Sequence, residues 1–313
     1  MSKKLVLATA ILFGVTGAAL AEFPEKPITI VVPNGAGSTL NAVARVYEPY
    51  LEAELGVPVN VEVMPGAGTT LGSRHVIESE PDGYTILMSN ENLLGVFGQN
   101  KLDPYQLDSL TPIVKAGGIP TVLVGRPGMD GDPLELLKAS SSEAPMIAAV
   151  QIGALSHLVM LDLAAKSGAT FRLIHQGGGE QVKAALAGKV DVTVLTVVAA
   201  KQHHEAGTLK VMAIGTQERL DIMPDVPTFA ELGLDVNFKI SWLFFVPKGT
   251  PADRVEKLEA AFTGAFNNPE VEAKYAEMTM VDRTLLTDEA LTEYVEKQAN
   301  LMKHLAETSG LRK

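Results

Sequence analysis

Short apolar runs alternate with longer stretches of helical spacing along most of the chain. Residues 28–32 form a continuous apolar run, and residues 57–63 carry four valines that alternate with other residues. A short continuous run is typical of a fully buried strand, whereas alternation is typical of a half-buried one. Between them, residues 40–55 carry apolar side chains at helical spacing, and Gly56 is a stop signal. The pattern predicts strand, helix and strand in this order.

The alternation continues to the end of the chain. Further strands are predicted at residues 84–88, 121–124, 146–150, 171–174, 190–195, 210–214 and 242–246. Helices are predicted at residues 71–79, 155–166, 180–187 and 288–308, and we expect the chain to be helical from Pro251, with a break at residues 267–269. Pro49 is expected to kink or interrupt the first helix. Strands that alternate with helices predict an α/β fold with parallel sheet.

The first 21 residues have the pattern of a secretory signal. Lys3 and Lys4 form a charged start, residues 5–15 are mostly apolar, and Ala19-Leu20-Ala21 is a small-x-small cleavage site. The alternative is an uncleaved anchor. Because glycines interrupt the apolar stretch and it falls short of the ~20 residues of a spanning helix, cleavage is favoured. We therefore expect a periplasmic protein that begins at Glu22 when mature.

Charge and cysteine content narrow the class of partner. The net charge of −11 argues against nucleic acid and against anionic membrane surfaces as partners. The sequence has no cysteine, so neither a disulfide nor a lipid-bearing cysteine at the signal junction is available. We expect a monomer held together by its core rather than by covalent links.

Two loops of small residues follow the first two strands. We call residues 33–39 the first loop and residues 65–70 the second loop. A small-residue loop between a strand and a helix directs backbone N–H groups and the positive end of a helix dipole toward an anion. Ordinary turn glycines are the alternative for Gly37, Gly66 and Gly68, and helix capping is the alternative for the two hydroxyl residues Ser38 and Thr39. Two such loops favour a site for small anions.

The other motifs in the sequence are weaker evidence for a functional site. Residues 66–72 imitate a dinucleotide fingerprint, but no well-placed acid follows the next strand, where a nucleotide site needs one. None of the six histidines lies in a zinc motif, and Ser156 beside His157 has no strained elbow around it. We expect no metal, no cofactor and no catalytic centre. His175 is either a cleft residue or a packing residue, and Trp242 is expected to pack.

The chain resembles the periplasmic receptors of tripartite tricarboxylate transporters, also called Bug-type receptors. Six strings carry the resemblance in the family's order and spacing: Ile30-Val31-Val32-Pro33 with the first loop and residues 41–45, Met64-Pro65-Gly66-Ala67-Gly68, Pro81-Asp82-Gly83-Tyr84-Thr85, Gly177-Gly178-Gly179-Glu180 with Ala187-Gly188-Lys189-Val190-Asp191, Pro224-Asp225-Val226-Pro227-Thr228, and Val246-Pro247-Lys248-Gly249-Thr250-Pro251. The resemblance covers essentially the whole chain after residue 21. At Asn41, where the family usually has an acid, the first loop departs from the pattern.

The resemblance implies a type II periplasmic-binding-protein fold, with two α/β domains around a central cleft and two crossovers. Domain I would comprise residues 22–121 and 245–313, and domain II residues 122–244. The implied ligand is a small organic acid, a di- or tricarboxylate above all, which the two early loops hold through backbone N–H groups and water. The implied partners are the membrane permease subunits of the transporter.

The sequence leaves three functions open: a receptor for a transporter, a receptor that feeds a membrane sensor, and a secreted α/β enzyme acting on a carboxylate. We expect a receptor rather than an enzyme. The expected ligand-binding residues are Asn34, Gly35, Ala36, Gly37, Ser38, Thr39, Asn41, Gly66, Ala67, Gly68, Thr69, Asn90, Gln151, Gly153, Ser156, Gln176 and Thr196.

Overall fold

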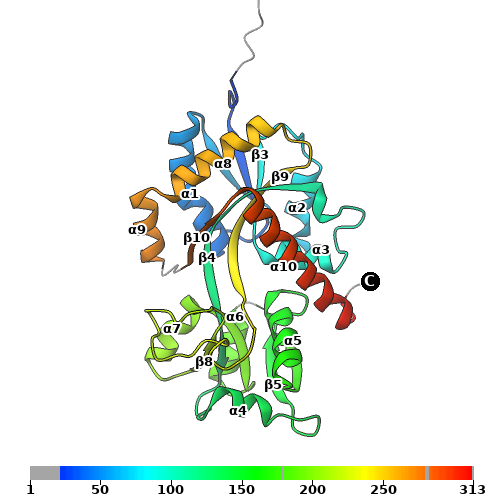
Figure 1. Ribbon diagram of the computed structural model, residues 1–313, viewed down its shortest axis with the longest axis vertical. Coiled ribbons are helices and arrows are strands. Elements are labelled where there is room, and N and C mark those ends of the chain that lie inside the picture. The colour runs from blue at the N-terminus through cyan, green and yellow to red at the C-terminus, as the bar shows by residue number, and fades with distance from the viewer. Residues whose placement is uncertain (1–21, 178, 279–281, 312–313) are drawn as a thin grey trace, which may run out of the picture.

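Two bodies joined by a pair of long strands make up the molecule (Figure 1). The computed structural model describes residues 22–177, 179–278 and 282–311, so the predicted signal at residues 1–21 lies outside the described part. The two joining strands are β4 (Leu110–Gly125) and β9 (Lys239–Pro247). They run antiparallel to each other, and with them the strands form one ten-stranded sheet that extends through both bodies.

The upper body in Figure 1 contains the first three strands. β1 (Ile28–Val32) lies between β2 (Val59–Val63) and β3 (Thr85–Ser89) with parallel pairing on both sides, and β9 pairs antiparallel with β3. Its helices are α1 (Thr39–Leu55), α2 (Thr70–Ile77), α3 (Glu91–Gly98), α8 (Ala252–Phe266), α9 (Pro269–Glu277) and α10 (Asp288–Thr308). The short strand β10 (Asp282–Leu286) pairs with β4.

The lower body is built around three parallel strands. β5 (Met146–Val150) lies between β6 (Phe171–His175) and β7 (Val192–Thr196). The last part of β4 pairs antiparallel with both β7 and β8 (Lys210–Ile214). The helices of this body are α4 (Pro133–Lys138), α5 (Leu155–Ser167), α6 (Gly179–Leu186) and α7 (Val197–Glu205).

Strand β4 therefore belongs to both bodies. Strands β4 and β9 approach each other closely where β4 passes from one body to the other. The register between β4 and β9 shifts between Lys115 and Gly118. Gly117 has φ +82°, and a Cβ added at Gly118 would lie 2.5 Å from the carbonyl oxygen of Ile240. No side chain fits at that distance, so this backbone contact at the crossover requires glycine.

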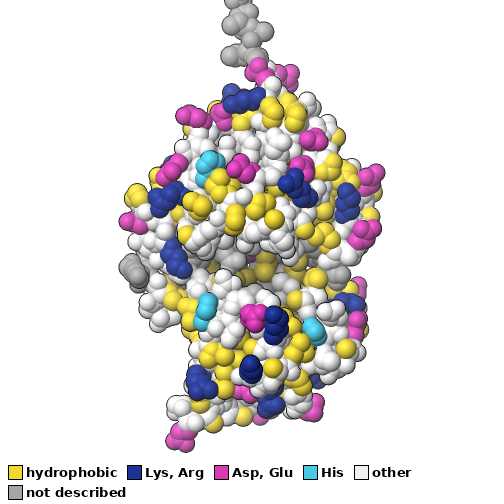
Figure 2. Space-filling view, turned by 180° about the vertical axis from the view of Figure 1, so that it is seen from behind, with side chains coloured by type: hydrophobic (Ala, Val, Ile, Leu, Met, Phe, Trp, Pro, Cys, Tyr) yellow, Lys and Arg dark blue, Asp and Glu magenta, His cyan; other side chains and the backbone are white. Residues whose placement is uncertain are grey.

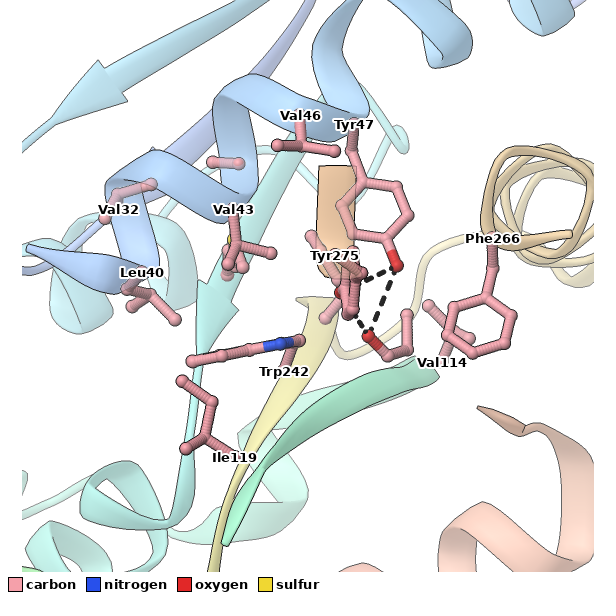
Figure 3. Close-up of a cluster of buried hydrophobic side chains, with 14 of the residues drawn as sticks. Val32, Leu40, Val43, Val46, Tyr47, Val114, Ile119, Trp242, Phe266 and Tyr275 are labelled. Atoms are coloured by element: carbon pink, nitrogen blue, oxygen red, sulfur yellow. Dashed lines mark hydrogen bonds between the residues drawn. The ribbon is translucent and has the colours of Figure 1, made fainter. Parts of the chain in front are cut away.

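A buried cluster beneath α1 anchors the crossover to the upper body (Figure 3). The hydroxyl groups of Tyr47 and Tyr275 lie 3.0 Å apart, and each lies within hydrogen-bond distance of the carbonyl oxygen of Ala116 on β4. These three contacts share only two hydroxyl protons. The Tyr47 hydroxyl therefore donates to Tyr275 or to Ala116, but not to both at once. Trp242 of β9 is 1% exposed and packs in the same cluster, as the sequence predicts.

Several sequence predictions differ from the structure. Helix α1 runs unbroken through Pro49, which is exposed, so that solvent can reach the carbonyl that proline leaves without an N–H donor. β10 contradicts the expectation that the chain is helical from Pro251 onward, apart from the break at residues 267–269. β4 begins at Leu110 rather than at residue 121, and the sequence did not predict α3, α4 or α7.

Candidate functional site

A cavity of about 520 Å³ lies between the two bodies, where the space-filling view shows a hollow (Figure 2). The upper body contributes Gly37, Ser38 and Thr39 from the first loop and the start of α1. The lower body contributes residues around β5, α6 and β7, and the crossover strands contribute one residue each. From the lower body and the crossover strands the polar lining residues are Thr121, Gln151, Ser156, Gln181 and Thr196.

A second cavity of about 150 Å³ continues the first at the level of the second loop. Gly68 and Thr69 line it from the second loop, and Lys101 lines it from the segment after α3. Asn92, Gln151 and Ala154 line both cavities, so the two share a wall. We call the two cavities together the cleft. It is a space between the bodies, lined from the upper body by residues of the first and second loops.

The first loop ends in a capped helix whose leading N–H groups remain available. Ser38 is the N-cap of α1, and its hydroxyl oxygen accepts the N–H of Asn41 at 3.2 Å. The Asn41 amide in turn donates to the Ala36 carbonyl at 2.6 Å, which holds the loop closed. The N–H groups of Gly37 and Thr39 have no acceptor among the described residues. Free donors at the positive end of a 17-residue helix make this end of the cleft suited to an anion.

The second loop has an unusual backbone. Gly66, Ala67, Gly68 and Thr69 all have positive φ, with values of 148°, 46°, 66° and 78°. For a β-branched residue such as Thr69 this conformation is a true outlier, and strain of this kind persists where the surroundings determine it. The hydroxyl oxygen of Thr69 is buried and has no hydrogen-bond partner within the described chain. A strained loop therefore lines the smaller cavity, and it contains a buried hydroxyl without a partner.

The glycine after this loop has a packing role instead. A Cβ at Gly72 would lie 2.9 Å from the Met64 carbonyl oxygen and 3.0 Å from the Cβ of Pro33. Gly72 thus lets α2 approach the end of β1 and the residue that follows β2. This accounts for the third glycine of the apparent dinucleotide fingerprint without any nucleotide.

Residues 151–157, here called the third loop, use their own side chains to satisfy their N–H groups. The Gln151 N–H donates to the Ser156 hydroxyl oxygen at 3.0 Å, and the Gly153 N–H donates to Nδ1 of His157 at 3.1 Å. The Ile152 N–H donates to Nδ1 of His175 at 3.2 Å, which gives that histidine a role in holding the loop. The third loop therefore offers side chains to the cleft rather than free backbone donors.

The hydrogen bonds of this loop determine which group Ser156 can donate and which nitrogen of His157 carries the proton. The Ser156 oxygen also accepts the Gln181 amide at 3.2 Å, so its own O–H remains as a donor that lines the cleft. Burial lowers the pKa of His157, which favours the neutral ring. Since Nδ1 accepts a hydrogen bond, the proton of the neutral ring lies on Nε2.

Two hydrogen bonds join the bodies across one side of the cleft. Oδ1 of Asn92 accepts the Leu155 N–H at 2.9 Å, and the Gln99 amide donates to the Gly153 carbonyl at 2.7 Å. These bonds connect α3 and the residue after it to the third loop and the start of α5. They hold the third loop close to the upper body on this side.

The wall behind α3 contains a buried carboxyl group. Glu91 is 2% exposed; one carboxyl oxygen accepts the Tyr294 hydroxyl at 2.6 Å and the other accepts the Ser241 N–H at 2.8 Å. Burial raises the pKa of Glu91, while the two donated hydrogen bonds oppose that shift. The group fixes the first turn of α3 to β9 and α10, and so positions Asn92.

The structure gathers most of the predicted binding residues around the cleft. Those that line it are Asn34, Gly37, Ser38, Thr39, Gly68, Thr69, Gln151, Gly153, Ser156 and Thr196. Those that line neither of the two cavities are Gly35, Ala36, Asn41, Gly66, Ala67, Asn90 and Gln176. Asn41 closes the first loop, and Asn90 is the N-cap of α3, whose side chain accepts the Asn92 N–H at 3.0 Å.

Sequence reasoning missed four polar residues that line the cleft: Asn92, Lys101, Thr121 and Gln181. Lys101 is the one charged residue among the described residues that line the two cavities. Asn90 is the sequence feature that could have identified Asn92. Asparagine is a common N-cap, so Asn90 predicts a helix that begins at the end of β3 and includes Asn92. No motif marks Lys101 or Gln181.

Other candidate chemistry does not assemble. Nε2 of His204 lies 3.2 Å from a carboxylate oxygen of Asp225, and His203 contacts Thr208, so the two neighbouring histidines face different partners. Within residues 22–177, 179–278 and 282–311, no group of three or more potential ligands could hold a metal ion. Across the same described ranges, no helix is both long and apolar enough to cross a membrane.

Comparison with known proteins places this cleft in a family. The sequence pattern described as "Tripartite tricarboxylate transporter family receptor" matches residues 43–311. Protein BugT of Bordetella pertussis is 33% identical over 236 residues, which cover 73% of this chain and 72% of BugT. The crystal structure of a TctC solute binding protein from Polaromonas superposes with a TM-score of 0.79 at 22% identity, covering 92% of this chain and 100% of that one.

A further solved structure includes a ligand. MatC from Rhodopseudomonas palustris, determined with bound malate, is 26% identical with a TM-score of 0.73, over 90% of this chain and 99% of that one. The two-domain receptor fold predicted from the sequence is thus confirmed. The chain belongs to the TctC family, the Bug-type receptors of tripartite tricarboxylate transporters.

Proposed function

We propose that the protein is a periplasmic receptor that captures a small organic acid, a di- or tricarboxylate, and presents it to the membrane permease of a tripartite tricarboxylate-type transporter. Delivery to a membrane sensor is a variant in which the same capture step serves a different partner. The malate bound to MatC supports a carboxylate as the ligand class. The predicted signal at residues 1–21 supports the periplasm as the location.

One observation carries the proposal: both small-residue loops lie on the same cleft, and the first presents unpaired N–H groups at a helix start. Backbone donors fixed in place stabilise a carboxylate without a rotamer cost, and the surrounding hydroxyls of Thr39, Ser156 and Thr196 are further donors. An enzyme would require a base or a nucleophile with a partner, and the described lining residues contain no such pair. Receptor rather than enzyme is the function that the cleft supports.

We propose that the seventeen residues predicted from the sequence contact the ligand, shape the loops or α3, or border the cleft. Gly37, Ser38, Thr39, Gly68 and Thr69 contact the ligand from the upper body, and Gln151, Gly153, Ser156 and Thr196 contact it from the lower body. Gly35, Ala36, Asn41, Gly66, Ala67 and Asn90 shape the loops or α3, and Asn34 and Gln176 border the cleft. The ligand favours closure because it contacts both bodies at once.

The proposed domains are residues 22–121 with 245–313, and residues 122–244. The contact of Gly118 with Ile240 and the paired crossover strands support a hinge close to the first boundary. Strand β9 enters the upper body between Lys239 and Leu243. Before this point it pairs with β4 alone, and after it with both β4 and β3. A hinge at both crossovers allows the bodies to close as units.

Thermal unfolding of residues 22–313 with a panel of mono-, di- and tricarboxylates tests the proposal. A ligand that binds the native state alone stabilises it by about 2.7 kcal/mol at a hundredfold excess over Kd. We expect a clear rise of the melting temperature with at least one di- or tricarboxylate, and recovery of that acid unchanged after incubation. No rise with any acid would contradict a carboxylate receptor, and conversion of the acid would instead indicate an enzyme.

A further inference from the structure

Lys101 reaches from the upper body to the third loop at one end of the cleft. It follows α3, and its backbone N–H donates to the Val96 carbonyl at 3.1 Å, which fixes where the side chain begins. A Cβ added at Gly153 would lie 3.0 Å from Nζ of Lys101, so the ammonium group lies directly against that glycine. The positively charged group therefore lines the smaller cavity, while the residue as a whole is exposed to solvent.

No anion of the protein neutralises this ammonium group. Within the described chain, the Lys101 side chain forms no hydrogen bond and no ion pair. Lys115, by contrast, lies 3.2 Å from Asp282. No aspartate or glutamate is among the described residues that line either cavity. Partial burial lowers the pKa of Lys101, and no carboxylate of the described residues opposes that shift.

The larger cavity differs in chemistry from the smaller one. There Gly37, Ser38 and Thr39 present N–H groups and hydroxyls, all of them neutral donors, at the start of α1. Asn34 of the same loop lines the smaller cavity. The wall formed by Asn92, Gln151 and Ala154 is common to both cavities, so a molecule that fills both extends from the first loop to Lys101. Such a molecule has two ends, and each end meets a group that attracts negative charge.

We propose that Lys101 is the counter-ion for a second carboxylate, so that the cleft selects elongated dicarboxylates over monocarboxylates of the same length. One carboxylate binds at the first loop and the other lies beside Lys101, Gly68 and Thr69. This inference rests on the proposed function, since it assigns a charge count to the acid that the receptor captures. An ion pair in a partly desolvated cleft is stronger than one in open water. The second carboxylate therefore increases the affinity of the acid for the cleft.

Matched acids test the charge count directly. Calorimetric titration of residues 22–313 compares succinate with butanoate and adipate with hexanoate, so that each pair differs in one terminal carboxylate. The wild-type protein should bind the better diacid about 10- to 100-fold more tightly than its monoacid, the range of a hydrogen bond to a charged group. In Lys101→Met this preference should disappear while the affinity for the monoacid is retained.

Two control variants separate local from general effects. Lys101→Arg keeps the charge and should keep most of the preference. Lys189→Met removes the same charge from an exposed lysine that lines neither cavity, and should change neither affinity. If Lys101→Met binds the diacid as the wild type does, or weakens mono- and diacid equally, the assignment of Lys101 is wrong while the receptor function stands. If no acid of the panel binds to the wild type, both the assignment and the proposed function fail.

Discussion

Asn92 accepts a hydrogen bond through Oδ1 from the backbone N–H of Leu155 at 2.9 Å, across the cleft between the two bodies. The acceptor lies on the second residue of α3 and the donor on the first residue of α5. Because Asn92 also lines both cavities, it connects the position of the third loop to the space that the ligand fills. We therefore expect closure and ligand contact to depend on the same side chain.

Asn92→Ala is expected to weaken binding of the captured acid about tenfold, the value of one hydrogen bond of ordinary strength. The melting temperature of the free protein should change little, because water reaches the Leu155 N–H when the bodies separate. Calorimetric titration measures the affinity. Asn60→Ala, an exposed residue of β2 that lines neither cavity, is the matched control. Wild-type affinity in Asn92→Ala would show that this cross-cleft bond has no part in capture.

Gly37→Val should block the larger cavity without unfolding the protein. No heavy atom lies within 4 Å of a Cβ at Gly37 and its φ is not positive, so the side chain fits the fold but occupies the ligand space. We expect an affinity loss of about 10- to 100-fold, from an overpacking cost of about 1–3 kcal/mol. Circular dichroism and thermal melting check that the fold is retained.

Gly35→Val is the control for this substitution. Gly35 is in the same loop and has the same open surroundings, but it lines neither cavity. Equal loss of binding in both variants would mean that the loop as a whole, rather than the cavity at Gly37, holds the acid. Gly66→Val is less informative because φ at Gly66 is +148° and its Cβ would lie 3.1 Å from Leu71.

Glu91→Ala should destabilise the protein, since it leaves the buried Ser241 N–H without an acceptor. We expect the free energy of unfolding to fall by about 1–3 kcal/mol in urea denaturation. Glu91→Gln should cost less, because its carbonyl accepts that N–H and its amide donates to the Tyr294 oxygen. If the two variants lose equal stability, the hydrogen bonds of Glu91 are not what holds α3 to the crossover.

The pH dependence of Glu91 has a definite sign. Its folded-state pKa is raised above the ordinary value of 4.5, so the folded protein binds the proton more tightly than the unfolded chain does. The stabilisation is present below about pH 4.5 and is lost as the pH rises through the folded value. Melting temperatures of the wild type and Glu91→Gln should therefore approach each other at acidic pH and diverge as the pH rises, which a pH series of thermal melts checks.

His157 has the opposite effect on stability. Burial lowers its pKa below the ordinary value of 6.5, so the folded protein favours the neutral ring that accepts the Gly153 N–H. This contribution is present above about pH 6.5 and is lost as the pH falls through the folded value. His157→Gln, whose carbonyl keeps an acceptor, should melt with a weaker dependence on pH below 6.5. His304→Gln, at an exposed position on α10, is the matched control substitution.

The sequence predicts elements well where local pattern and tertiary role agree. β1, β5 and β8 have the predicted bounds because each is a short apolar run whose burial follows from composition alone. The sequence pattern predicts β4 only from residue 121, because Pro112, Gly117 and Gly118 interrupt it. Those residues are tolerated since the two crossing strands shift register there and approach too closely for side chains.

The same contrast applies to the cleft. The first and second loops could be predicted because small residues between a strand and a helix are typical of sites where an anion approaches the backbone. Lys101 and Gln181 could not, since each reaches the cleft through the packing of two bodies that are distant in the sequence. Asn90 was assigned to the ligand, but its type and position equally suit the N-cap that the structure shows.

The central claim is that the N–H groups of the two early loops hold the acid. Titration of ¹⁵N-labelled protein, residues 22–313, with the acid that raises the melting temperature most, followed by two-dimensional amide NMR, tests it most directly. We predict saturable shifts of the Gly37, Thr39 and Gly68 amide signals, with no shift at Gly207 in the turn between α7 and β8. Saturable shifts elsewhere, with the amides of both loops unmoved, would contradict the account.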